Sequence, residues 1–329
     1  MKCFPSLRRA ASVFAISAAV LPVQAAPESV TAVDLINLFE KAGGIHPGRR
    51  KAHAAGLCAE GTFTPSENEW FAGAPLLSNG ELNAQLRFSL AGANPNADPR
   101  KPGARGVGLQ IGDGGSISHI FTGNSFPVFA GKNPETFYGL VEAGLPGPDG
   151  KRDPQKVMEY IKNHPSVQAN VAYNRGRGVA ASFANTQYWG LHTFFYNPAE
   201  GEPVPFRWEL VPNAGDKTLA PEAAAELEQD FLETRLAEQI AAGEASFRLE
   251  AVIGQPGDSI NDPSQQWPED RERVLLGEVM LTSSGGKACE PLNFDPVRVS
   301  TGFSTSNDPV LAMRSTAYAI SLAKRLSNQ

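Results

Sequence analysis

Short segments with alternating apolar and polar residues run through the middle of the chain. The segment 85–90 (QLRFSL) alternates strictly, and 247–253 (FRLEAVI) does so over most of its length. A period of two is typical of half-buried strands. Further strands are predicted at the remaining short apolar segments, which are the run from Thr62, 107–111, 117–121, 186–196, 206–211 and 274–281.

Helical spacing appears at both ends of the chain. In 29–44 the apolar residues Val33, Ile36 and Phe39 lie on one stripe, and Gly43-Gly44 ends the pattern. The same criteria predict helices over 134–141, 154–163, 221–243 and 308–325. An open sheet of about seven or eight strands joined by short turns would have two edge strands with unpaired backbone groups. Closure of the sheet into a barrel removes both edges. We therefore predict an α+β fold, an antiparallel eight-stranded β-barrel surrounded by helices.

The composition and charge of the chain limit the kinds of macromolecule that it is expected to bind. The 329 residues are 41% hydrophobic, enough for a large core, and 32 glycines and 26 prolines favour a loop-rich fold over a helical bundle. A net charge of −6 gives no basic surface for nucleic acid or for an anionic membrane. We therefore expect neither partner.

The first residues are typical of a targeting segment. Lys2, Arg8 and Arg9 form a basic start, and the apolar run 10–23 is too short to span a membrane. Small residues around Ala25 predict cleavage there. The expected organisation is a signal peptide over 1–25 and one mature domain over 26–329, exported to the periplasm if the source is Gram-negative.

The mature chain keeps two cysteines, Cys58 and Cys289, since Cys3 leaves with the leader. They could pair in an oxidising compartment. Two unpaired buried thiols are equally compatible with the sequence.

Two segments carry candidate chemistry. His53 lies among small residues that leave its ring accessible, next to the basic cluster 49–51. A lone histidine is more often structural, and a basic turn is usually solvated, although guanidinium groups also bind carboxylates. In the last helix, Arg314, Tyr318 and Arg325 fall on one face. A guanidinium one turn from a phenol favours the phenolate, which is one of the few axial ligands of haem.

Six segments in order carry a resemblance to a known family. They are RKAHAAGLCAEGTF (50–63), RFS (87–89), NSFPVF with NPETF (124–137), GLHTFF (190–195), DPSQQWPE (262–269) and DPVLAMRSTAYAIS (308–321). The chain resembles the monofunctional haem catalases, and most closely their short exported relatives, the catalase-related peroxidases. The resemblance extends from about residue 45 to the C-terminus.

The resemblance implies a role for each matching residue. His53 would be the distal histidine that moves the peroxide proton, with Ser89 as its hydrogen-bond partner. Tyr318 would be the axial tyrosinate, with Arg314 as its donor. The other implied positions are Arg50, Arg87 and Arg325 for the haem propionates, Phe137 beside the porphyrin, and the pair His192 and Asp308 in support of the tyrosinate arginine.

The chain also departs from the family pattern. The usual position of the distal asparagine holds Ser125, but Asn124 keeps the spacing to Phe137 and is our candidate for that role. Leu322 replaces a histidine that follows the tyrosine in the family. The C-terminal helical domain and much of the N-terminal arm are missing, so we expect a monomer or homodimer. His46, His119 and His164 have no counterpart and are interpreted as structural or exposed.

The expected function is that of a haem b peroxidase that reduces hydrogen peroxide or organic hydroperoxides with a small organic donor. A small true catalase is the leading alternative. A lipid-hydroperoxide isomerase and a haem carrier without turnover also remain open. The carrier would need Tyr318 but not His53.

Overall fold

The computed structural model describes Met1 and residues 29–329, and the predicted leader lies outside this range. The strands are β1 (Gly56–Pro65), β2 (Leu82–Leu90), β3 (Arg105–Ile111), β4 (His119–Asn124), β5 (Val179–Ala180), β6 (Tyr188–Trp189), β7 (Phe194–Tyr196), β8 (Val204–Pro212), β9 (Thr218–Leu219), β10 (Ser246–Ile253), β11 (Arg273–Ser284) and β12 (Phe303–Thr305). The helices are α1 (Ala32–Gly43), α2 (Pro134–Ala143), α3 (Pro154–Asn163), α4 (Pro165–Asn174), α5 (Pro221–Ala225), α6 (Phe231–Ala241) and α7 (Pro309–Leu326).

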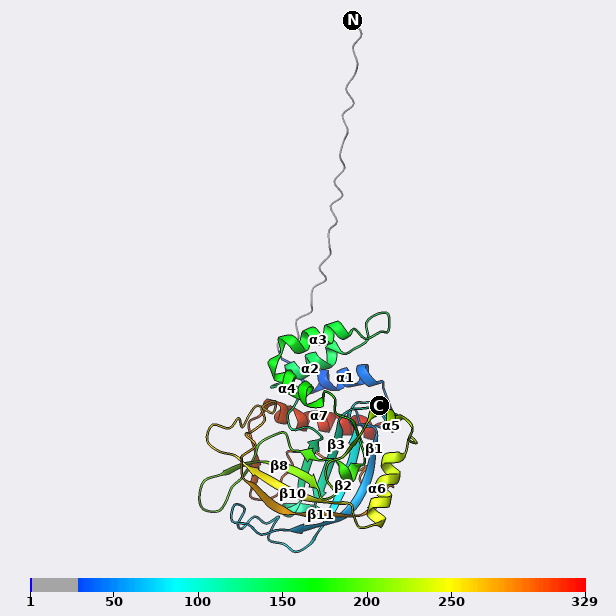
Figure 1. Ribbon diagram of the computed structural model, residues 1–329. Helices are drawn as coiled ribbons and strands as arrows, with labels where there is room; N and C mark the ends of the chain where they lie inside the picture. Colours follow the sequence, from blue (N-terminus) through cyan, green and yellow to red (C-terminus); the bar gives the residue numbers. More distant parts are fainter. Residues whose placement is uncertain (2–28) are drawn as a thin grey trace.

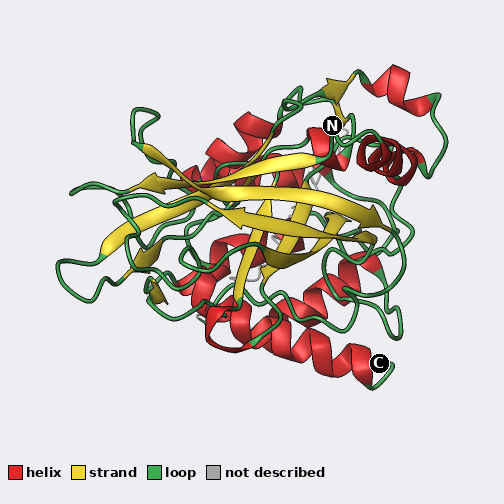
Figure 2. Cartoon of the chain, turned by 90° about the horizontal axis from the view of Figure 1, so that it is seen from below, coloured by secondary structure: helices red, strands yellow, loops and turns green. Residues whose placement is uncertain are grey.

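Eight strands form a closed antiparallel barrel, which confirms the predicted fold (Figure 2). Their order is β10-β11-β1-β2-β3-β4-β6-β8, and β8 pairs back onto β10. The short strands β7 and β12 extend the sheet beyond β8. Apolar residues at alternate positions fill the interior, among them Phe88, Trp208 and Phe247, which are almost fully buried. The predicted alternation therefore marks the inner face of the barrel.

A layer of helices covers one end of the barrel (Figure 1). Helix α1 packs on α2 and on α7, and Ile36 of α1 is buried against Ala317 of α7. Thr31 and Asp34 form a capping box at the start of α1. Asp308 caps α7 by accepting hydrogen bonds from the amides of residues 310 and 311. These caps fix where both helices begin, next to the barrel end that they cover.

Two predicted elements are wrong in their extent. The strand expected over 186–196 is interrupted between β6 and β7, because Gly190 packs against the Trp208 ring and His192 turns to hydrogen-bond Asp308. The helix expected over 221–243 is split into α5 and α6; between them the Phe231 amide donates to the Glu228 carbonyl, and the Leu227 carbonyl accepts from Arg100. At the interrupted strand, tertiary contacts override the local pattern. Helix α4 was not predicted, and β1 begins at Gly56, earlier than expected.

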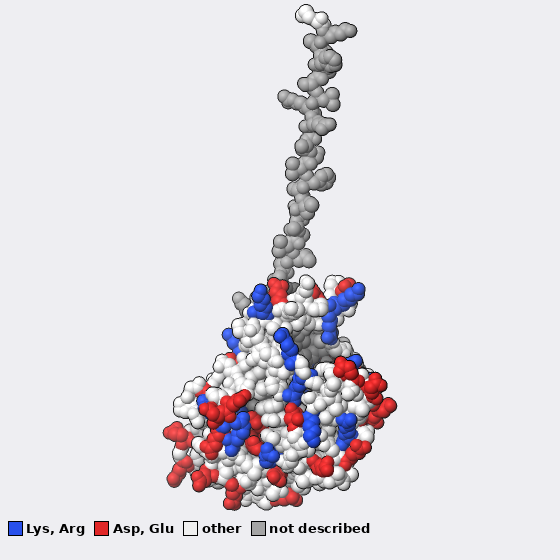
Figure 3. Space-filling model, viewed as in Figure 1, with Lys and Arg blue, Asp and Glu red and all other residues white. Residues whose placement is uncertain are grey.

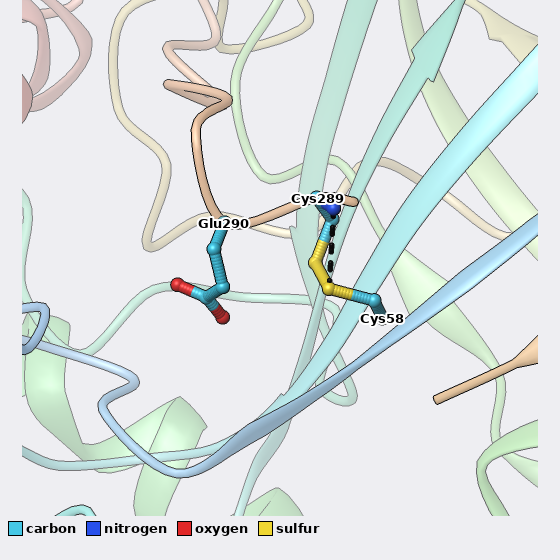
Figure 4. A group of neighbouring side chains, drawn as sticks. All are labelled: Cys58, Cys289 and Glu290. Carbon is cyan, nitrogen blue, oxygen red and sulfur yellow. Dashed lines mark hydrogen bonds between the residues drawn. A yellow bond between two sulfur atoms is a disulfide. The ribbon is translucent and has the colours of Figure 1, made fainter. Parts of the chain in front are cut away.

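The two cysteines of the described chain form a disulfide. Cys58 in β1 and Cys289 in the segment after β11 are 231 residues apart in sequence, and their Cα atoms are 5.4 Å apart (Figure 4). The pairing that the sequence left open is therefore present. A cross-link that closes so long a loop is expected to contribute several kcal/mol, about 3–5 by loop-entropy reasoning.

The visible surface carries both signs of charge. On the face shown in Figure 3, acidic and basic side chains are interspersed, and acidic ones are frequent along the lower edge. None of the helices in the described part of the chain has both the length and the apolar character needed to cross a membrane.

Candidate active site

One cavity lies between the barrel and the helical layer. It encloses about 1210 Å³ of empty space, counting its open mouth. Its walls come from the segment before β1, from β2, β3 and β4, and from α1, α2 and α7. Nine of the eleven residues given a role by the sequence line it, namely Arg50, His53, Arg87, Ser89, Asn124, Phe137, Arg314, Tyr318 and Arg325, whereas His192 and Asp308 are not part of its wall.

His53 enters this cavity from a strained backbone. Its φ of 51° lies in the left-handed region, which is costly for a non-glycine residue and is frequent at functional sites. Its Nδ1 lies 3.0 Å from the Ser89 hydroxyl, which is 3.4 Å from the Gly106 carbonyl. If the hydroxyl donates to that carbonyl, Nδ1–H must donate to the hydroxyl. The other nitrogen, Nε2, is then left without a proton.

The environment keeps this imidazole neutral. Burial, followed by the positive charges of Arg87 and Arg314, lowers the pKa of His53 to about 4. The Arg87 guanidinium donates to the carbonyls of His53 and Ala54 at 2.9 and 3.1 Å and so holds the strained segment in place. His53 is therefore a pre-oriented neutral base at neutral pH.

Gly106 of β3 makes this arrangement possible. A Cβ at Gly106 would lie 2.6 Å from His53 Nδ1 and 2.8 Å from Ser89 Oγ. We expect Gly106→Ala to displace the histidine, to lower catalytic turnover about tenfold and to cost about 1–3 kcal/mol of stability. Steady-state kinetics and urea unfolding measure both effects. Gly103→Ala is the matched control, because its Cβ would meet its nearest atom at 3.7 Å, and an equal loss in that variant would contradict the argument.

Tyr318 and Arg314 approach the cavity from one face of α7. The Arg314 Nη2 donates to the Tyr318 hydroxyl at 3.1 Å, over one helical turn. A phenolate at this position would have its positive partner in place. The helix therefore presents a phenol oxygen to the cavity with a guanidinium donor beside it.

A second buried pair lies at the start of α7. His192 Nδ1 is 2.6 Å from Asp308 Oδ2, and both side chains are 1% exposed. The same carboxylate caps the helix with its other oxygen. His192 Nε2 is buried and has no hydrogen-bond partner among residues 29–329. The pair thus offers a free ring nitrogen in the protein interior at the start of the tyrosine helix.

Three arginines gather at another part of the cavity wall. Arg50, Arg87 and Arg325, here called the arginine rim, all contact the carboxylate of Glu290. Within the described chain, the Nε of Arg50 and one Nη of Arg325 are buried without a hydrogen-bond partner. Such donors are suited to carboxylates supplied by a ligand.

The residues that line the cavity can accommodate a porphyrin only if they meet its requirements. Haem requires an apolar slot, a ligand for iron and a site for its carboxylates, and the cavity offers each of them. Phe137, Phe129 and Met313 supply apolar walls, Tyr318 supplies an oxygen ligand, and the arginine rim supplies unsatisfied donors. The residues present therefore fit the group.

Asn124 and Ser125, the two residues considered for the distal asparagine position, differ in where they lie. Asn124, the last residue of β4, lines the cavity. Ser125 is 4% exposed and is not part of the cavity wall, and its hydroxyl accepts a hydrogen bond from the Arg105 amide. Of the two positions, only Asn124 can therefore contact a substrate in the cavity.

Some lining residues were missed by sequence reasoning. Gly106 and Gly108 alternate along β3, and Gly108 gives room to the ring of Phe294. A G-x-G pair inside a strand signals close approach and could have been found. Phe294 lines the cavity, and Glu290 contacts three lining arginines; both lie in an irregular segment with no periodic signal, so no pattern pointed to them.

Buried histidines predict acid sensitivity. Burial lowers the pKa of His119 to about 3 and those of His53 and His192 to about 4, against 6.5 in an unfolded chain. Stability is therefore full above pH 6.5 and falls as pH decreases, by about 1.4 kcal/mol per pH unit for each such histidine. Glu209 has the opposite effect on stability. Burial raises its pKa, so as pH falls the folded protein binds a proton at this site before the unfolded chain does. Urea unfolding of the cofactor-free protein between pH 7.5 and 4.5 checks the slope, and a flat profile would contradict it.

Comparisons with known proteins agree with this geometry. The profile of the Catalase family matches residues 28–329. A catalase-related peroxidase of Synechococcus elongatus is 34% identical over 94% of this chain and 93% of its own length. One from Mycolicibacterium paratuberculosis is 31% identical over 88% of this chain and 93% of its own length.

Solved structures show the same fold. A fungal catalase superposes with a TM-score of 0.76 at 21% identity, covering 89% of this chain and 62% of the catalase. A bacterial catalase gives 0.76 at 20% identity, covering 94% and 64%. The chain thus spans less than two thirds of these catalases, and the likeness to them concerns the fold alone.

Proposed function

This chain belongs to the catalase family, and on that premise we propose that it is a haem-dependent peroxidase acting on hydrogen peroxide or organic hydroperoxides. The observation that carries the proposal is the convergence of His53, Tyr318 and the arginine rim on one cavity. We assign Tyr318 as the iron ligand, the rim as the site of the haem carboxylates, and haem b as the cofactor. Phe137 would pack beside the ring.

The residues of the chain supply positioning and proton transfer. When bound, haem supplies the electrons that reduce the peroxide O–O bond. The Nε2 of His53 takes the proton from one peroxide oxygen and returns it to the other, a general acid–base role worth about 10²–10⁴-fold. Ser89 holds the imidazole tautomer, and Asn124 hydrogen-bonds the second oxygen. Arg314 donates a hydrogen bond to the Tyr318 oxygen that would bind the iron.

The electron source distinguishes peroxidase from catalase activity. A small organic reductant returns two electrons for each peroxide consumed, whereas a true catalase takes them from a second hydrogen peroxide and releases oxygen. We expect the hemin-loaded protein to show the spectrum of ferric tyrosinate haem and to oxidise 2-methoxyphenol with hydrogen peroxide. Oxygen evolution without the phenol at a higher rate would assign catalase activity instead, and a protein that binds no hemin would exclude both.

We also propose that the mature protein is exported and acts in the periplasm as a single domain over 26–329, as a monomer or homodimer. The basic start, the apolar run and Ala25 support the leader, and the Cys58–Cys289 disulfide is typical of an oxidising compartment. N-terminal sequencing of the purified protein tests the leader, and retention of Met1 would exclude cleavage. Sedimentation would give the oligomeric state.

A further inference from the structure

Glu290 is the acid that neutralises the arginine rim. Its carboxylate lies 3.1 Å from Arg87 Nε, 3.5 Å from Arg325 Nη1 and 3.8 Å from Arg50 Nε. Within residues 29–329, no other carboxylate forms an ion pair with these three guanidinium groups. Three positive charges and one negative charge leave the rim with a net charge of +2.

The segment that carries Glu290 is fixed. Cys289 is bonded to Cys58 in β1, and Figure 4 shows the Glu290 side chain beside the disulfide, with a carboxylate oxygen within 4.8 Å of both sulfur atoms. The Arg50 Nη2 donates to the Leu292 carbonyl at 2.9 Å and approaches the carbonyls of residues 289 and 290 at 3.4 Å. The backbone around Glu290 is therefore held next to the rim, while the side chain that reaches the arginines is 37% exposed.

The rim still has donors to offer. Arg50 Nε and Arg325 Nη2 are buried in the cavity wall with no hydrogen-bond partner in the described residues. Although burial alone would favour the neutral acid, the charges of Arg87, Arg50 and Arg325 hold the pKa of Glu290 below its ordinary value. Glu290 is thus ionised at neutral pH and takes up only part of the positive charge.

We infer that Glu290 is a carboxylate of the chain that shares the arginine rim with the cofactor and sets the charge of the rim to match a porphyrin with two carboxylates. This inference rests on the haem function proposed above and deepens it. The two carboxylates of haem complete the neutralisation of the rim. Glu290 stabilises the arginines before the cofactor binds, and its repulsion limits the affinity for more strongly anionic ligands.

Hemin binding by the full chain tests this assignment without any measurement of turnover. The cofactor-free protein is titrated with hemin and with hemin dimethyl ester, which lacks both carboxylates, and absorption is recorded. We expect Glu290→Gln to raise the rim charge to +3 and to bind hemin about tenfold more tightly, with a steeper dependence on salt. The affinity for the dimethyl ester should change less than about twofold.

Three further variants distinguish an effect of the rim charge on hemin affinity from an effect of misfolding. Glu290→Asp keeps the charge and should bind hemin as the wild type does. Arg325→Gln should weaken hemin binding, and adding Glu290→Gln to it should restore the affinity, because the rim returns to +2. Glu60→Gln is the control, since Glu60 is exposed on β1 and hydrogen-bonds Ser283 outside the rim. Circular dichroism confirms that each variant is folded.

The outcomes are distinct. Unchanged or weaker hemin binding in folded Glu290→Gln, or equal changes for hemin and its ester, would overturn the inference while leaving the haem function intact. If the Glu290→Gln variant does not fold, failure of the substitution to restore affinity in the Arg325→Gln background overturns it in the same way. If the wild type binds neither compound, the proposed function and this inference both fail.

Discussion

Replacing His53 with alanine is expected to lower the rate of hydrogen peroxide consumption by about 10²–10⁴-fold. The neutral ring, oriented by Ser89, is the base among the cavity-lining residues that can accept the peroxide proton and return it. Alanine removes the ring and leaves the Arg87 hydrogen bonds to the backbone carbonyls in place. Stopped-flow absorption of the hemin-loaded variant, mixed with peroxide, measures the loss.

A catalytic and a structural role for His53 predict different results for hemin binding. If His53 is the catalytic base, the hemin affinity and ferric spectrum of His53→Ala should stay within about twofold of the wild type, because neither the rim nor Tyr318 is altered. A structural role would change both. His164→Ala is the matched control, since His164 hydrogen-bonds the Tyr160 carbonyl away from the cavity. Peroxide consumption that continues at the wild-type rate in His53→Ala would remove the enzyme mechanism and favour haem carriage.

Tyr318→Phe is expected to weaken hemin binding by on the order of 100-fold and to change the absorption spectrum of what remains bound. The substitution removes a single oxygen atom and preserves the ring that packs in the cavity wall. It also leaves the Arg314 guanidinium without its acceptor, so a positive charge in the cavity wall loses its partner. Titration with hemin, followed by absorption, measures both changes.

The control for this variant is another tyrosine near the cavity. Tyr138→Phe removes a hydroxyl from α2, and Tyr138 does not line the cavity. It should bind hemin as the wild type does. A Tyr318→Phe protein with wild-type affinity and spectrum would show that iron is held by some other group and would remove the assignment of Tyr318.

Much of the fold was predictable because its signals are local. Strict alternation in 85–90 and 247–253 predicted β2 and β10 closely, since each strand has one face in the barrel core. The broken elements were not predictable from local pattern. Residues 186–196 are apolar enough for one long strand, and only the contacts of Gly190 with Trp208 and of His192 with Asp308 interrupt it.

In the candidate site, too, the residues with a local signal could be predicted from spacing, and the others could not. Tyr318 and Arg314 are one helical turn apart, so spacing alone placed them together. His53 and the arginine rim come from separate parts of the chain, and the ordered motifs rather than any local pattern indicated that they share a site. Glu290 escaped notice because its role depends on the positions of three distant arginines. The positive φ of His53 is likewise visible only in the folded backbone.

Because the cavity is bounded by an early segment and a late helix, its assembly has an order in time. A ribosome releases His53 before α7, synthesis proceeds at about 5–20 residues per second, and a single domain folds as a unit. A partly synthesised chain would hold the imidazole but neither Tyr318 nor Arg325. Nascent polypeptides should therefore have little capacity to capture iron porphyrin, which makes cofactor acquisition a final step of maturation.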